Sequence, residues 1–173
     1  EESQNIKQQF SYLFQFGALF SFLNVIENIS VMLKEYTNLS DDLIEKIAYT
    51  NLEIVGLPKN CAKLYPSQIS GGMKKRVALA RSLALEPKIL FLDEPTSGLD
   101  PSSTQKINEL ILYLRDVLNM TVVIITHDLE TIKTVLDRFV ILKKDIIFNG
   151  NIKEAMNSDD EFIKDFLTNK KAE

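Results

Sequence analysis

The residues best suited to chemistry lie in one stretch of the sequence, between Ser67 and Pro101. Ser70, Gly71 and Gly72 stand directly before a run with the apolar periodicity of a helix. Backbone amides and a hydroxyl at a helix N-terminus can converge on an anion, and glycines let the backbone approach it closely. The pattern therefore predicts that phosphate binds at the start of this helix.

Two adjacent carboxylates come next. The apolar run Ile89–Leu92 is typical of a buried strand, and it is followed by Asp93 and Glu94. Paired carboxylates at the end of a strand favour a metal site with a base beside it. A second apolar run, Val122–Thr126, is followed by His127. Each of these motifs alone is common at ordinary helix starts and turns. Together, in this order along the chain, they predict phosphate chemistry.

This ordered set resembles the signature motif, Walker B strand and D-loop of ATP-binding-cassette (ABC) ATPases, with His127 in the place of that family's switch histidine. Gln15, at the end of an aromatic run, matches the family's strand-end glutamine. The resemblance implies ATP and Mg²⁺ as cofactors, with Asp93 and Gln15 as metal ligands. It implies two catalytic residues, the general base Glu94 and the γ-phosphate donor His127. The nucleotide-binding residues that it implies are Gln15, Ser70, Gly71, Gly72, Met73 and Asp100.

The alternation of apolar strands with amphipathic helices predicts an α/β fold with a mainly parallel sheet and crossover helices. The resemblance makes this a P-loop NTPase-like core with flanking helices and a small inserted helical subdomain, and with the N-terminal part of the ABC fold missing. The expected parts are the end of a core strand with the Gln loop (1–16), the helical subdomain with the signature motif (17–86), the ATPase core (87–150) and a C-terminal helical tail (151–173).

Local patterns predict the individual elements. We expect Ser102 or Ser103 to cap the helix after Pro101, and the cations from Lys74 to Arg76 mostly to face solvent. Residues 169–173 are expected to be frayed. The other elements expected are strands over 10–16 and 120–126, the latter buried, helices over 41–55 and 129–136, a hairpin of 139–142 with 146–148, and helical structure over 152–167.

None of the six glycines opens the sequence Gly-x-x-x-x-Gly-Lys-Ser/Thr, so the phosphate-wrapping P-loop is absent while the later motifs stand in order. We interpret this as truncation of a longer protein. A degenerate subunit is the alternative, but loss of function should also have relaxed Asp93, Glu94 and His127. The full-length protein is therefore expected to hydrolyse ATP, and the 173-residue chain alone to hydrolyse it negligibly.

Composition limits the other possibilities. The net charge, from 20 basic and 24 acidic residues, is −4, which offers no basic field to hold nucleic acid. A single cysteine, Cys61, excludes an internal disulfide and suits a reducing compartment. No apolar run approaches the roughly 20 residues that cross a bilayer, and the acidic start 1–9 is unlike a signal peptide. With the resemblance, this predicts a cytoplasmic protein, peripheral on the inner membrane.

Two segments narrow the resemblance. Residues 13–20 and 65–73 are most similar to the ATPase subunit of Mla-type phospholipid transporters, also known as toluene-tolerance ABC proteins. Met73 departs from the Gln of most ABC ATPases and is frequent in lipid and amino-acid importers. The implied function is transport of phospholipid or another lipid across the inner membrane. The implied partners are a membrane permease, a second ABC ATPase protomer in a head-to-tail dimer and an MCE-type lipid-binding protein, without nucleic acid.

Part of the apolar segment 18–29 is expected to form a socket for the permease, with Phe22 facing the partner. Two alternatives stay open. One is an ABC-type ATPase that acts in DNA repair or on ribosomes, which the acidic charge balance disfavours. The other is a noncatalytic regulatory ABC subunit, which does not explain Glu94 and His127.

Overall fold

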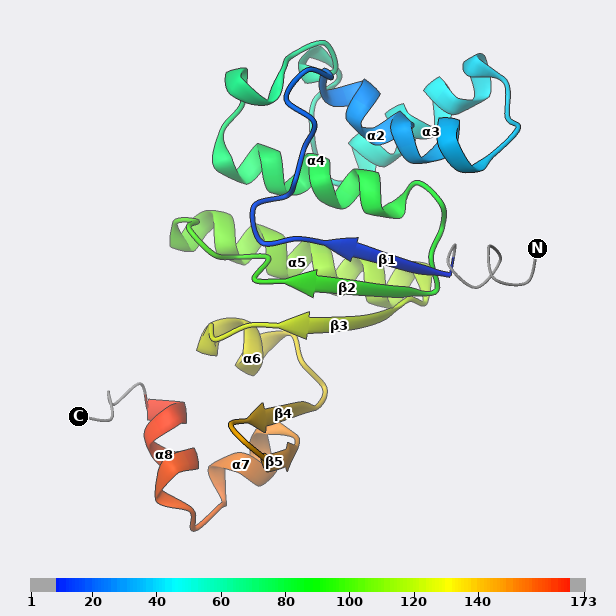
Figure 1. Ribbon diagram of the computed structural model, residues 1–173. Coiled ribbons are helices and arrows are strands. Elements are labelled where there is room, and N and C mark those ends of the chain that lie inside the picture. The colour runs from blue at the N-terminus through cyan, green and yellow to red at the C-terminus, as the bar shows by residue number, and fades with distance from the viewer. Residues whose placement is uncertain (1–8, 169–173) are drawn as a thin grey trace. The chain divides into compact units, whose positions relative to one another are not determined.

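The computed structural model describes residues 9–168, whose helices and strands are shown in Figure 1. They form two compact units, of which the first ends at Ile125 and the second begins at Thr126. The division predicted at residues 16, 86 and 150 concerns functional parts of the ABC fold and stays a prediction.

The first unit is built on a parallel sheet of three strands, β1 (Phe10–Leu13), β2 (Ile89–Asp93) and β3 (Thr121–Ile125), with β2 in the centre. Leu13 pairs with Leu92, and Leu92 pairs with Ile124. The expected parallel sheet is confirmed. Because the strands are parallel and in register, the residues that follow each strand lie at one edge of the sheet.

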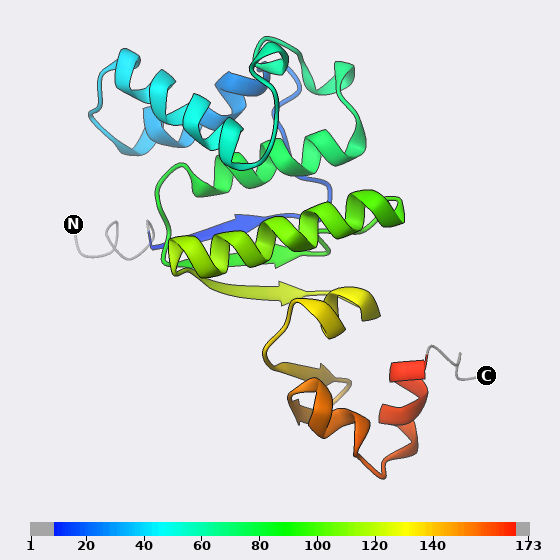
Figure 2. The ribbon, with the colours of Figure 1, turned by 180° about the vertical axis from the view of Figure 1, so that it is seen from behind.

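One face of this sheet is covered by α4 (Gly71–Leu83) and α5 (Pro101–Leu118). Leu13 and Leu92 line one small gap together with Leu79 of α4 and Ile111 of α5. Seen from behind, α5 lies over the strands and runs nearly along their direction (Figure 2). The side chains of Leu90 and Leu92 are fully buried on this face, so it forms the core of the first unit.

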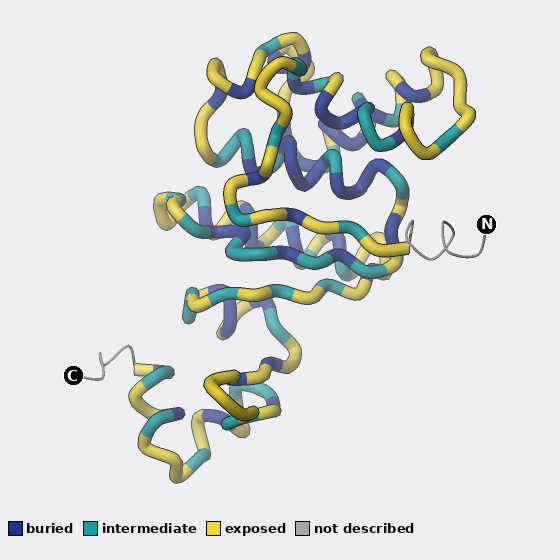
Figure 3. Tube along the Cα trace, viewed as in Figure 1, coloured by how far each residue is buried: buried dark blue, intermediate teal, exposed yellow. Residues whose placement is uncertain are grey.

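The opposite face of the sheet is open. Tyr12 stacks on Phe91 with ring centroids 4.7 Å apart, yet 55% of Tyr12 is exposed. On β3 the expected burial is wrong: Val123 and Ile125 are exposed, and the trace alternates between exposed and half-buried positions (Figure 3). The reason is that only the face carrying Val122 and Ile124 is turned toward the covering helices.

Three helices form the helical part of the first unit. α2 (Val25–Tyr36) and α3 (Asp41–Ile54) pack on each other and on α4. Asn24 caps α2 by accepting a hydrogen bond from the Glu27 backbone N–H at 2.9 Å, and the Glu27 carboxylate accepts one from the Asn24 N–H in return. The expected helix over 41–55 is confirmed to within one residue. Two short 3₁₀ turns, Lys59–Cys61 and Pro66–Gln68, lead from α3 to α4.

The first strand is shorter than the expected 10–16, because β1 ends at Leu13. The backbone N–H of Gly17 donates a hydrogen bond to the carbonyl of Phe14 at 2.7 Å, which closes a turn. Gly17 and Ala18 have φ angles of +74° and +43°, values that a strand cannot contain. Gln15 therefore lies in a turn, two residues beyond the strand.

The cap of α5 is Asp100, and the expectation of Ser102 or Ser103 is wrong. The carboxylate of Asp100 accepts hydrogen bonds from the Ser103 N–H at 3.0 Å and from its hydroxyl at 2.6 Å. Pro101 occupies the first helical position, where a missing N–H breaks no helical hydrogen bond. The proline therefore begins this helix instead of separating it from the preceding turn.

The second unit contains α6 (Leu129–Thr134), an antiparallel hairpin of β4 (Phe139–Leu142) and β5 (Ile146–Gly150), and the helices α7 (Ile152–Met156) and α8 (Glu161–Thr168). The expected hairpin is confirmed. The buried residues that form the core of this unit are Ile132, Phe139, Ile141, Ala155, Ile163 and Leu167.

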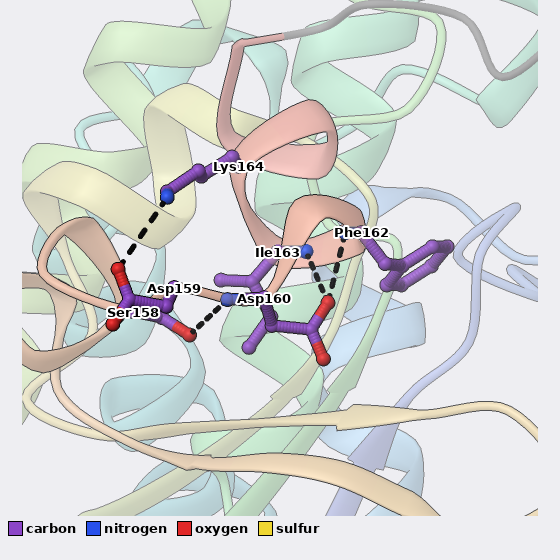
Figure 4. A network of polar contacts seen from close by, with 6 residues as sticks. All are labelled: Ser158, Asp159, Asp160, Phe162, Ile163 and Lys164. Atoms are coloured by element: carbon purple, nitrogen blue, oxygen red, sulfur yellow. Dashed lines mark hydrogen bonds and ion pairs between the residues drawn. The ribbon is translucent and has the colours of Figure 1, made fainter.

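The expected helical structure over 152–167 is broken into two helices. Asp160 begins the second of them: its carboxylate accepts hydrogen bonds from the N–H groups of Phe162 at 2.8 Å and Ile163 at 3.4 Å (Figure 4). The Ser158 hydroxyl in turn accepts a hydrogen bond from the Asp160 N–H at 3.2 Å. These short polar side chains satisfy free backbone groups and so stop the helix locally. The frayed end expected over 169–173 lies outside the described residues.

Candidate nucleotide site

The carboxyl edge of the parallel sheet gathers three of the predicted site residues. Asp93 is the last residue of β2 and Glu94 follows it, while Gln15 lies two residues beyond β1. Since Leu13 and Leu92 pair in register, the Gln15 turn and the two carboxylates lie at the same edge. An amide and two carboxylates are thus grouped where ligands bind in open α/β sheets.

Lys75 joins these two turns, and it is the exception among the cations of 74–76, most of which are expected to face solvent. Only 7% of Lys75 is exposed. Its ammonium donates hydrogen bonds to the backbone carbonyls of Gln15 and Glu94, the latter at 2.8 Å. The physical reason lies in helical geometry, because Lys75 shares a face of α4 with the buried residues Ala78 and Leu79.

Opposing effects act on the Lys75 ammonium. Burial lowers its pKa, because the charged form loses water, while the nearby carboxylates of Glu94 and Asp93 act to raise the pKa. The two carbonyl acceptors supply the hydrogen bonds that a buried ammonium requires. The lysine is therefore part of the site and not of the solvent-facing surface.

Glu94 has a strained backbone. Its φ angle is +46°, in the left-handed region, which for a residue other than glycine costs on the order of 1 kcal/mol or more. Its N–H donates a hydrogen bond to the carbonyl of Ile125 at 2.9 Å, and its carbonyl accepts from Lys75 and from the N–H of Ser97. Because of this turn, Glu94 no longer follows the alternation of side chains along β2. Hydrogen bonds hold both its N–H and its carbonyl.

The N-terminus of α4 is accessible. The hydroxyl of Ser70 caps the helix by accepting a hydrogen bond from the Met73 N–H at 3.3 Å. Apart from its chain neighbours and the backbone of its own helix, no heavy atom of the described residues lies within 4 Å of the position that a Cβ on Gly71 would take, and Ser70 and Gly71 are exposed. α4 has 13 residues, so its first amides carry the positive end of a helix dipole. An anion can therefore reach these amides without displacing a side chain.

Asp100 lies near this helix start. A Cβ on Gly72 would be 3.8 Å from the Ser103 hydroxyl, which is bonded to the Asp100 carboxylate. Donation by the Ser103 hydroxyl and N–H lowers the pKa of Asp100. The predicted residues thus fall into a sheet-edge group (Gln15, Asp93, Glu94) and a helix-start group (Ser70, Gly71, Gly72, Met73, Asp100).

His127 belongs to the second unit and follows β3 by two residues. Its neighbour Asp128 caps α6 through the N–H groups of Glu130 and Thr131. The roles of His127 and of both groups as nucleotide contacts stay predictions.

A second cation on α4 holds the turn after β1. The guanidinium of Arg81 donates hydrogen bonds to the carbonyls of Gly17 at 2.7 Å and Ala18 at 2.9 Å. Burial lowers the pKa of Arg81. A Cβ on Gly17 would be only 3.2 Å from the Cβ of Ala78, so the turn touches the helix. Lys75, Ala78 and Arg81 recur every three residues, and this spacing could have revealed their shared face.

The donor set at the sheet edge fits a magnesium ion that arrives with a nucleotide. Mg²⁺ commonly takes one or two protein carboxylates and completes its shell with phosphate oxygens and water. Asp93 offers a carboxylate and Gln15 an amide oxygen at the same edge. Within residues 9–168, no three His, Cys, Asp or Glu side chains gather as a metal site of their own.

Comparison with known proteins identifies the family. The sequence profile described as ABC transporter matches residues 1–97. The chain belongs to the ABC transporter family. Its fold is accordingly the P-loop NTPase fold of ABC cassettes, of which it covers a part.

Individual relatives are similar over nearly all of the chain. The intermembrane phospholipid transport system ATP-binding protein MlaF of Haemophilus influenzae is 36% identical over 96% of the chain and 63% of its own length, and MlaF of Escherichia coli K12 is 37% identical over 94% and 60%. The probable ribonucleotide transport ATP-binding protein mkl of Mycobacterium leprae is 36% identical over 99% and 49%. The chain thus spans between about half and 63% of the length of these relatives.

Solved structures agree with this result. The ATP-binding cassette MJ0796, in a dimeric post-hydrolysis state bound to ADP and Pi, matches with a TM-score of 0.77 and 30% identity over 86% of the chain and 65% of the cassette. CbiO1 of Clostridium perfringens, part of the transporter complex cbiONQ, matches with a TM-score of 0.79 and 32% identity over 88% and 61%. No helix within residues 9–168 has both the length and the apolar character of a membrane span.

Proposed function

We propose that this chain is the ATP-hydrolysing part of an ABC transporter ATPase. The observation that carries the proposal is the sheet-edge group, in which Gln15, Asp93 and Glu94 lie at the carboxyl ends of neighbouring parallel strands. The accessible start of α4 adds donors for phosphate oxygens. Membership of the ABC transporter family supports the same activity.

The residues divide the reaction between them. Asp93 and the amide of Gln15 would hold Mg²⁺, which draws charge from the phosphate oxygens when it is bound. Glu94 accepts a proton from the attacking water at a carboxylate oxygen, while the bond from the γ-phosphorus to the ADP oxygen breaks. His127 donates a hydrogen bond to the γ-phosphoryl group. The strained turn at Glu94 sets where its carboxylate points.

The test is Glu94→Gln in the protein produced from its complete reading frame. ATP binding should be kept, while turnover falls by about two or more orders of magnitude, because the amide cannot accept the proton. Glu109→Gln, at an exposed position on α5, is the matched control and should leave turnover unchanged. A Glu94→Gln protein that keeps most of its turnover would remove Glu94 from this role. The 173-residue chain alone should hydrolyse ATP negligibly.

We further propose that the helix-start group serves a nucleotide held by a second protomer in a head-to-tail dimer. The similarity to the cassette MJ0796, which is dimeric with ADP and Pi, supports this proposal. In a mixed dimer of Ser70→Arg with Glu94→Gln, both lesions should fall in one composite site and the other should stay active. If both sites are dead, the arrangement across protomers is wrong.

The apolar segment before α2 supports a permease socket. Phe22 is 73% exposed, and its ring lies 5.8 Å from that of the exposed Phe20. We propose that a membrane permease docks here, which would place the protein on the cytoplasmic face of the inner membrane. Phe22→Ser should abolish copurification with the permease and keep basal ATPase activity. Tyr36→Ser, at an exposed aromatic position at the far end of α2, is the matched control and should keep copurification.

The transported molecule that we propose is a phospholipid or another lipid, with an MCE-type lipid-binding protein as an additional partner. The similarity to MlaF proteins and the residue Met73 support it. Mass spectrometry of the proteins and lipids that copurify with the assembled transporter tests it. Recovery of a ribonucleotide in place of lipid would favour the activity for which the mkl relative is named.

A further inference from the structure

One side chain ties together the two turns of the sheet edge. Lys75 lies in the early part of α4, and its ammonium donates to the carbonyls of Gln15 and Glu94. The first carbonyl belongs to the turn after β1 and the second to the turn after β2. A single buried ammonium therefore sets the separation of the two turns.

The Glu94 turn needs such a tie. The positive φ of Glu94 is unfavourable for a residue with a side chain, so it persists only where its neighbours hold it. The N–H of Glu94 is held by Ile125 of β3, and its carbonyl by Lys75. Without the ammonium, the carbonyl of Glu94 keeps the 3.2 Å bond from the Ser97 N–H within the same turn, and it loses its link to α4.

The Gln15 turn is tied to the same helix at several levels. Lys75 holds the Gln15 carbonyl, Gly17 lies against Ala78, and Arg81 holds the carbonyls of Gly17 and Ala18. Arg81 anchors the far end of the turn, whereas Lys75 alone of these residues also reaches the Glu94 turn. Arg81 therefore anchors one turn, whereas Lys75 connects the two turns to each other.

We propose that Lys75 is a positioning residue for ATP hydrolysis, whose ammonium holds the Gln15 and Glu94 turns at the separation that lets the metal-holding amide of Gln15 and the carboxylate base of Glu94 serve one nucleotide. Lysine suits this task because its ammonium has three donors and can serve two carbonyls at once. The inference rests on the proposed ATPase function. Lys75 acts through two backbones and touches no reacting atom in this scheme.

The test compares Lys75→Met with Lys74→Met in the protein from its complete reading frame. Methionine keeps much of the stem's length and removes the donors. Lys75→Met should lower kcat by about tenfold or more while the KM for ATP stays within about threefold, because the residue positions reacting groups and does not bind nucleotide. Lys74 is half-buried on the same helix, and its change should leave kcat within about twofold. A kcat for Lys75→Met within about twofold of the unmodified protein overturns the proposal.

Combination with Glu94→Gln separates positioning from folding. If Lys75 positions Glu94, Lys75→Met should add little to the loss already caused by Glu94→Gln, because the two act as a unit. If Lys75 only stabilises the fold, Lys75→Met should lower the residual rate of Glu94→Gln by the same factor by which it lowers the rate of the unmodified protein. That proportional loss would also overturn the proposal.

Amide hydrogen exchange without nucleotide gives an independent measurement. Lys75→Met should speed exchange in the segments 14–18 and 94–97 and leave α3 unchanged. Unchanged exchange in both segments overturns the tie itself. If the unmodified protein hydrolyses no ATP, the proposed function fails, and the positioning role of Lys75 fails with it. Faster exchange in Lys75→Met would in that case show only that Lys75 holds the two turns structurally. If ATP is hydrolysed and only Lys75→Met is silent, this inference alone fails.

Discussion

The two faces of the three-stranded sheet differ in what they do for the protein. The face of Leu13, Leu90 and Leu92 is buried under α4 and α5. The face of Tyr12, Phe91 and Ile125 is open, although these three side chains are also largely apolar. Apolar character alone therefore does not tell which face is core. Of the two faces, the covered one carries the fully buried side chains, and it is therefore expected to contribute more to stability than the open one.

The sheet-edge group lies at the carboxyl edge of the sheet, between these two faces. Asp93 belongs by alternation to the open face, because its neighbours Leu92 and Leu90 mark the covered one. Glu94 leaves the alternation through its left-handed backbone. Four substitutions, on the two faces and in the segment after β1, test how far burial decides what each position contributes to stability.

The largest effect is expected on the covered face. Leu92 is 1% exposed, and Leu92→Ala should lower the free energy of unfolding by about 2–5 kcal/mol, through lost burial and the cavity that it leaves. Urea unfolding monitored by circular dichroism measures it. A loss below about 1 kcal/mol would mean that α4 and α5 do not cover this face tightly.

An intermediate effect is expected where the turn after β1 touches α4. Gly17→Ala should lower the free energy of unfolding by about 1–2 kcal/mol. The reasons are that Gly17 has a φ of +74° and that the new Cβ would lie 3.2 Å from the Cβ of Ala78. Gly98→Ala is the matched control, because it has the same φ of +74° and, its chain neighbours aside, no heavy atom of the described residues lies within 4 Å of the new Cβ. Thermal unfolding should show a smaller loss for Gly98→Ala. Equal losses of stability for the two variants would show that the positive φ alone, and not the contact with Ala78, causes the effect.

A smaller effect is expected on the open face. Ile125 has the same number of carbon atoms as Leu92 and is 64% exposed. Ile125→Ala should therefore lower the free energy of unfolding by less than about 1 kcal/mol in the same urea measurement. A loss equal to that of Leu92→Ala would show that something covers this face in solution, and the contrast between the two faces would fail.

The smallest effect on stability is expected at the proposed socket. Phe22→Ser should change the melting temperature by little, equivalent to less than about 0.5 kcal/mol, because the ring is mostly in solvent. Differential scanning calorimetry checks it. A sharp fall in melting temperature, as for a buried aromatic that costs about 3 kcal/mol or more, would place Phe22 in the core and move the socket elsewhere.

Much of the fold follows from local patterns. The parallel strands, α3 and the β4–β5 hairpin agree with the periodicity of their apolar residues. The errors occur where one residue type suits two structures. Pro101 can separate or begin a helix, and the tail 152–168 has helical composition on both sides of Ser158 and Asp160. In both places a side-chain hydrogen bond to the backbone decides.

The chemical types and the order of the site residues follow from local sequence: a capped helix start, a strand followed by Asp93 and Glu94, and a glutamine after the first strand. The burial of Lys75 between Gln15 and Glu94, and the openness of one face of the sheet, become visible in the three-dimensional structure. The physical reason is that burial and hydrogen bonding between residues 60 positions apart depend on packing, which no local pattern encodes.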